Sequence, residues 1–141
     1  MVQWGLAPIF HSGELIMSKL TFNWDLINTI KSELKLANEV RINFRETSHP
    51  EYRALCETTY NSRGKIKLHK ITIWLGDIAA DPIRNDINSV IAHELIHAKL
   101  FESQLDDPDC WHNLAFQLMA KMMEQKWPEL HNIYRAELDT D

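Results

Sequence analysis

The chain has 141 residues, of which 45% are hydrophobic and 25% charged, as is typical of one globular domain with one core. Its net charge of −5 argues against general nucleic-acid binding through bulk electrostatics. No apolar run approaches the roughly 20 residues that a helix needs to cross a bilayer, so we expect a soluble, cytoplasmic protein. Two cysteines, Cys56 and Cys110, are too few for a disulfide framework, which fits a reducing cytosol.

The first residues, MVQWGLAPIFHSGELI, lack the basic start of a signal peptide and show no clear structural pattern. We expect residues 1–17 to be a disordered tail or an upstream extension. Gly13-Glu14 can be encoded by a purine-rich string like a bacterial ribosome-binding site, which makes Met17 an alternative to Met1 as the native start. Residues 18–141 then form the predicted domain.

A helix is predicted to open the domain. Apolar side chains recur every four positions at Phe22, Leu26, Ile30 and Leu34, which indicates an amphipathic helix over residues 23–37.

Three strands are predicted to follow this helix. Residues 39–46 and 51–60 alternate apolar and polar side chains, as half-buried strands do. Residues 61–64, Asn-Ser-Arg-Gly, indicate a turn. Residues 65–75 give a third strand with a kink near Lys70. Two of the strands are expected to form a hairpin, so the sheet is predicted to be at least partly antiparallel.

A long buried helix is predicted next. Asp81 and Pro82 have the residue types of an N-cap and a first helical position. The helix is expected to continue, with a break near Asn85, to about Ser103. Its apolar residues lie on several faces, as in a helix that is buried all round.

Asp109 is expected to cap a further helix over residues 110–126, which ends at Trp127-Pro128 and is followed by a short helix over residues 129–138. Its predicted core stripe consists of Trp111, Leu114, Ala115, Leu118 and Met122. The order of helix, strands and helices predicts an α+β domain with helices packed on a small sheet.

The motif HELIH lies inside the long predicted helix. His93 and His97 are four positions apart, so they share one helix face and can hold one tetrahedral zinc ion. Glu94 projects beside them, where its carboxylate can take a proton from a zinc-activated water during attack on a carbonyl. This is the logic of zinc-dependent peptidases. The alternative is that the three polar side chains form a wetted helix edge.

Catalytic zinc sites usually have a third protein ligand. His112 follows His97 after 14 intervening residues, at the start of a helix that can fold back, and is the favoured candidate. Two glutamates are less suitable as the third ligand. Glu102 is too near to His97 on the same helix, and Glu124 lies late on the next helix. The alternative is that His112 is a first-turn residue beside an anchoring Trp111.

The stretches HELIHAKLF and WHNLAFQLM, with the strand GKIKLHKITI before them, resemble the SprT-like metallopeptidase domain, the family of bacterial SprT and the eukaryotic Spartan proteases. The resemblance covers about residues 20–123. It implies an α+β, zincin-like domain with HExxH on a buried helix. It also implies that Zn²⁺ is held by His93, His97 and His112, with Glu94 as the catalytic acid/base.

Spartan-type members cleave proteins crosslinked to DNA. The resemblance therefore implies a zinc metallopeptidase whose partners are a protein or peptide substrate and DNA. It implies a role in DNA–protein crosslink repair, a cytoplasmic and nucleoid-associated location, and no membrane.

The chain departs from the family pattern in two places. Asn113 stands where Gly usually follows the third histidine, and residues 127–141 contain no cysteine for the zinc ribbon that many members carry.

Two alternative functions remain open. One is a DNA- or protein-associated binding module with a structural zinc, which needs a fourth protein ligand such as Cys110 or Glu102. The other is a hydrolase of a non-peptide amide.

The second and third predicted strands and the turn between them offer further candidates. His69 and Tyr60 are each expected either to face solvent or to polarise a substrate carbonyl. Residues 63–70 are either a local basic patch for nucleic acid or a solvated strand face. The strand over residues 65–75 could also pair with an extended substrate.

Overall fold

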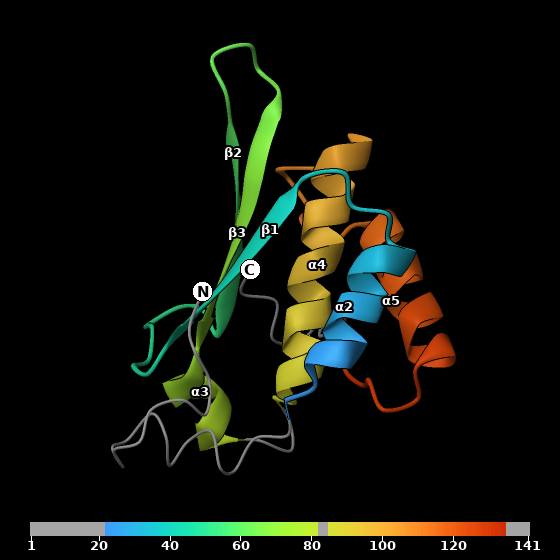
Figure 1. The fold of residues 1–141 in the computed structure, drawn as a ribbon. Helices are drawn as coiled ribbons and strands as arrows, with labels where there is room; N and C mark the ends of the chain where they lie inside the picture. The colour runs from blue at the N-terminus through green and yellow to red at the C-terminus, as the bar shows by residue number, and fades with distance from the viewer. Residues whose placement is uncertain (1–21, 82–84, 135–141) are drawn as a thin grey trace.

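The computed structural model describes residues 22–81 and 85–134 (Figure 1). These residues form an α+β fold with a mixed three-stranded sheet, which confirms the predicted class. The predicted features of residues 1–17 and the prediction for Pro82 lie outside the described residues. None of the helices in the described ranges is long and apolar enough to cross a membrane. In chain order the elements are α2 (Trp24–Glu33), β1 (Glu39–Arg45), β2 (Ala54–Tyr60), β3 (Ile66–Trp74), α3 (Leu75–Ala80), α4 (Ile87–Ser103) and α5 (Leu114–Lys126).

The sheet has the order β1-β3-β2, with β3 in the centre. β3 pairs in parallel with β1 and antiparallel with β2, so the predicted hairpin is confirmed. Gly64 adopts a φ of 76° in the turn, a conformation that glycine tolerates best because it has no Cβ. The predicted kink near Lys70 is wrong, because β3 is continuous. The ladder between β2 and β3 is irregular at Lys67 of β3 instead, because Thr59 pairs with Leu68 and the next residue, Tyr60, pairs with Ile66.

Helix α4 is the centre of the core. It contacts β2, β3, α2 and α5, and Figure 1 shows it between the sheet and the other two long helices. Because it is covered on all sides, apolar residues face every direction, as predicted for a buried helix. Ile71 and Ile73 of β3 are fully buried on the sheet side of this core.

The predicted start of this helix is wrong. Asp81 follows α3, a short helix that the sequence pattern did not indicate, and α4 begins six residues later. Asp86 is the N-cap, and its carboxylate accepts hydrogen bonds from the amide and the hydroxyl of Ser89. The predicted end at Ser103 is confirmed.

The predicted start and core face of α5 are also wrong. The N-cap is Asn113, whose side chain accepts a hydrogen bond from the Phe116 amide, and not Asp109. The side chains of Leu114, Leu118 and Met122 from the predicted stripe are 68%, 52% and 66% exposed. The buried residues of α5 are Phe116, Ala120 and Met123. Both faces of the helix are apolar, so contact with α4 decides which one turns inward.

Glu102, in the last turn of α4, joins three parts of the fold. Its carboxylate accepts hydrogen bonds from the Ala37 and Asn38 amides, at 2.8 and 3.0 Å, just before β1. It also lies 2.8 Å from Nε2 of His69 on β3, whose Nδ1 lies 2.8 Å from the hydroxyl of Thr58 on β2. His69 is fully buried in this network, so it neither faces solvent nor reaches a substrate.

These contacts shift the acidity of Glu102. Burial raises the pKa of its carboxyl, but the Ala37 hydrogen bond, the His69 and Asn38 hydrogen bonds and the charge on His69 lower it. The net effect is a pKa below the ordinary value of 4.5. The folded protein therefore favours the carboxylate more than the unfolded chain does.

Glu102→Gln is expected to lower the free energy of unfolding by about 2 kcal/mol at neutral pH, because hydrogen bonds to a charged group contribute roughly 1.5–3 kcal/mol. Since the folded-state pKa is lowered, this contribution is present above the ordinary pKa of 4.5 and is lost as the pH falls through the folded pKa. Urea unfolding at about pH 7 and about pH 4 should show a gap between wild type and variant that narrows at the lower pH.

The matched control for this change is Glu39→Gln, which removes an exposed ion pair with Arg41. Exposed pairs contribute little, so this variant should stay within about 0.5 kcal/mol of wild type at both pH values. A Glu102→Gln gap that does not depend on pH would contradict the assignment.

Candidate metal centre

Two elements bring three histidines together. His93 and His97 lie one turn apart on α4, and His112 lies just before α5. The loop between the helices is closed by the side-chain amide of Asn113, which donates to the Leu105 carbonyl at 2.9 Å. Asn113 thus fixes the loop and caps α5 at the same time.

The imidazoles converge on one point in a buried space. Nε2 of His112 lies 3.0 Å from Nε2 of His93 and 3.2 Å from Nε2 of His97. The three histidine residues are at most 7% exposed, and the ring of each packs against the ring of Phe116, with centroids 4.6–4.7 Å apart. Phe116 therefore forms an apolar base beneath the three ligands. Within the described residues, these histidines are the group whose ligand atoms lie close enough together to hold a metal ion.

The donor set fits a metal ion better than a hydrogen-bonded trio. Ligand nitrogens about 2.0–2.1 Å from a tetrahedral ion lie roughly 3.3–3.4 Å apart, close to the two observed separations. Without an ion, one N–H of His112 would have to serve His93 and His97 at the same time. An ion instead accepts a lone pair from all three rings. Imidazole nitrogens suit several transition metals, zinc among them.

A backbone carbonyl sets the tautomer of one ligand. Nδ1 of His93 lies 2.6 Å from the carbonyl oxygen of Ile133, so this nitrogen carries the proton and Nε2 presents its lone pair. The amide of Ile133 in turn donates to the Glu124 carboxylate at 2.8 Å. This places Glu124 behind the site as a support for the ligand.

The segment that provides this carbonyl contains no helix. The prediction of a helix over residues 129–138 is wrong for its described part, residues 129–134. Leu130 and Ile133 of this segment pack into the core. The amide of His131 donates a hydrogen bond of 3.0 Å to the hydroxyl of Ser89 on α4. Sequence reasoning missed this support, since a backbone carbonyl leaves no residue-type signal.

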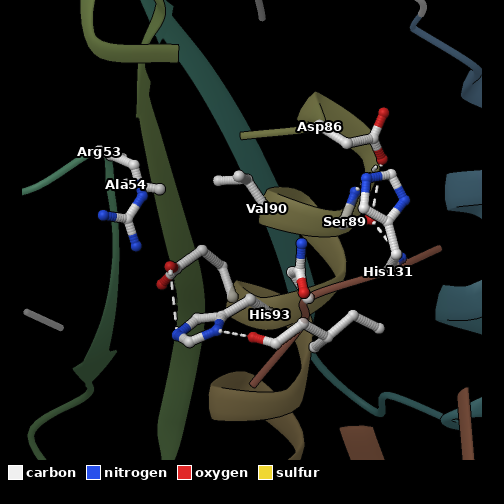
Figure 2. A pocket seen from close by; sticks show the side chains of 10 residues that line it. Arg53, Ala54, Asp86, Ser89, Val90, His93 and His131 are labelled. Atoms are coloured by element: carbon white, nitrogen blue, oxygen red, sulfur yellow. Dashed lines mark hydrogen bonds and ion pairs between the residues drawn. The ribbon is translucent and has the colours of Figure 1, made fainter. Parts of the chain in front are cut away.

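Glu94 lies beside the three ligands. It is 1% exposed, and its Oε2 lies 4.0 Å from Nε2 of His93. A small pocket opens at this point, lined by Arg53 and Ala54 at the start of β2, by the first turns of α4, and by residues 131–133 (Figure 2). The carboxylate is therefore placed where it can reach a water molecule next to the metal position.

The other candidates do not join this group. Cys110 is exposed, and Glu102 is engaged with His69, so neither serves as a fourth ligand within the described residues. Tyr60 lies, 53% exposed, at the end of β2 in the projecting hairpin. The exposed basic residues of the predicted patch, Arg63, Lys65 and Lys67, also lie in that hairpin.

The predicted pairing of a substrate with β3 is wrong, because both edges of this strand are occupied.

Glu124→Ala is expected to weaken metal binding by about tenfold, because loss of an outer-shell partner typically reduces affinity 10–100-fold. Glu124→Gln keeps an acceptor oxygen for the Ile133 amide and should bind metal nearly as well as wild type. Competition with a chromophoric chelator measures the affinities. The exposed Glu129→Ala is the control and should not change them. Equal affinities for all four proteins would contradict a supporting role.

Compared with known proteins, the chain matches no family model, no curated protein and no solved structure.

Proposed function

We propose that this protein is a zinc-dependent metalloendopeptidase of the SprT-like type, with a zincin-like arrangement of the HExxH helix against the sheet. The observation that supports this most directly is the convergence of three buried imidazole nitrogens with a buried carboxylate next to them. Three protein ligands leave one position of a tetrahedral ion for water, as catalytic zinc sites require.

In this mechanism His93, His97 and His112 hold the ion, and the Ile133 carbonyl keeps His93 in the tautomer that can bind it. Bound zinc would supply Lewis acidity, which lowers the pKa of a coordinated water to about 7 and polarises the substrate carbonyl. Glu94 accepts the proton of the attacking water and then donates it to the nitrogen of the leaving amine. Because Glu94 is buried, its interaction with these groups is weakly screened.

The substrate is proposed to lie along β2. Within residues 22–81 and 85–134, β2 is an edge strand whose outer side has no paired strand, and its first residue, Ala54, lines the pocket at Glu94. An extended peptide can add to such an edge through main-chain hydrogen bonds. The family resemblance suggests DNA-associated or DNA-crosslinked proteins as substrates, in the cytoplasm or at the nucleoid.

The alternative of a structural zinc module receives less support from the geometry. A closed site needs a fourth protein ligand. The two residues that the sequence offered for this role, Cys110 and Glu102, lie elsewhere.

Metal analysis tests the site itself. Wild-type protein purified without chelator is expected to contain about one zinc ion per chain, and His112→Ala much less, because it loses one of three ligands. His112→Ala should also unfold at a lower temperature, since metal binding contributes to folding. Cys110→Ser is the control and should keep its zinc. A cobalt-substituted protein with a thiolate absorption band would favour the structural alternative, and failure of wild-type protein to take up zinc on reconstitution would reject the site.

Glu94→Gln tests the chemistry. This variant is expected to retain zinc but to hydrolyse a mixed decapeptide pool at least about 100-fold more slowly, because general-base catalysis contributes 10²–10⁴-fold. Mass spectrometry of the products, with and without single-stranded DNA, measures the rates. The exposed Glu129→Gln should match wild type. Normal turnover in Glu94→Gln would rule out the mechanism.

A further inference from the structure

Arg53 is the cationic residue of the pocket beside the metal centre. It directly precedes β2, and its carbonyl oxygen accepts a hydrogen bond of 2.8 Å from the amide of Trp74 at the end of β3. The backbone that carries the side chain is therefore fixed to the sheet. Figure 2 shows Arg53 on the β2 side of the pocket, across from Asp86 and Ser89 of the α4 side.

The guanidinium of Arg53 has no partner within residues 22–81 and 85–134. Its Nε is buried without a hydrogen bond, and no carboxylate in these ranges forms an ion pair with it. Asp86, across the pocket, is engaged by Ser89 instead. A buried N–H without an acceptor is unfavourable, so this position is suited to an anion that the described part of the chain does not supply.

A carboxylate is the anion that fits this position in a peptidase. The planar guanidinium matches a carboxylate with two parallel hydrogen bonds. The enclosed space of the pocket is that of about one water molecule, so a whole side chain does not fit inside it. Arg53 is only partly buried, and a carboxylate can approach it from the open side.

We infer that Arg53 binds a carboxylate of the substrate close to the hydrolysed bond. This inference rests on the proposed peptidase function and narrows its substrate class to peptides with an acidic group near that bond. The carboxylate comes from an Asp or Glu side chain or from the C-terminus of the peptide. Arg53 thus determines specificity, whereas Glu94 carries the proton transfer.

Paired peptide pools test the inference through kinetics. One pair of decapeptide pools differs only in a central Glu or Gln, and a second pair differs only in a free or amidated C-terminus. Wild-type enzyme is expected to show a kcat/KM about tenfold higher for the acidic member of one pair, as charge-assisted hydrogen bonds allow. The pair that shows the preference identifies the source of the carboxylate.

The Arg53 variants then assign the preference to this residue. Arg53→Gln should cleave both members of the pair at the rate of the neutral one, and Arg53→Lys should keep part of the preference, since it retains the charge but not the planar fork. Arg45→Gln, at the exposed end of β1, is the matched control and should retain the full preference. An unchanged preference in Arg53→Gln, or no preference in wild type, would overturn the inference while leaving the peptidase function intact.

A binding measurement separates the two proposals. Zinc-loaded Glu94→Gln protein should bind the acidic peptide about tenfold more tightly than its neutral partner by calorimetry, and acidic peptide should shift the Nε–H NMR signal of Arg53. Adding Arg53→Gln to this protein should remove the difference in affinity. If wild-type enzyme hydrolyses no pool, the peptidase function fails. The binding comparison still decides whether Arg53 recognises a carboxylate, and equal affinities would reject that role.

Discussion

The convergence of three imidazole nitrogens inside an apolar core is the constraint on which the site depends. Burying His93, His97 and His112 without partners would be unfavourable, and one shared ion would satisfy all three at once. The surrounding structure serves this arrangement. Phe116 supports the three rings from below, and the loop closed by Asn113 returns the chain so that the third ring meets the first two. Metal binding and folding are therefore expected to be coupled.

Support for the site comes from a segment that carries no recognisable motif in the sequence. Residues 130–134 lie against α4, where the Ile133 carbonyl orients His93 and the Ile133 amide donates to Glu124. A chain of contacts thus runs from α5 through this segment to the ligand. It explains how a carboxylate that does not touch the metal position can still influence metal affinity, since a ring with a fixed orientation and tautomer loses less entropy on binding.

Helix α4 carries two separate polar networks. The candidate metal ligands His93 and His97 lie along its middle, whereas Glu102 in its last turn binds His69 and the chain before β1. The first network borders a pocket lined by His93 and Glu94. The second is satisfied within the protein and holds the sheet against the helix. The same residue types therefore have different roles on one helix, and only their partners distinguish them. Glu102 and His69 were both candidates for the site in sequence terms, and both belong to the structural network.

The sequence by itself determined the α+β class, the three strands, the hairpin and the buried character of the long helix, because each depends on local periodicity and turn chemistry. It also determined which histidines converge, since the i, i+4 spacing and a returning helix restrict the choice. Only the tertiary structure decided the start of α4, the inward face of α5 and the partner of His93. Asp81 and Asp86 are equally good caps, both faces of α5 are apolar, and a backbone carbonyl has no residue identity. For the start of α4 and the face of α5 the local pattern permitted two answers, and the tertiary packing selected one.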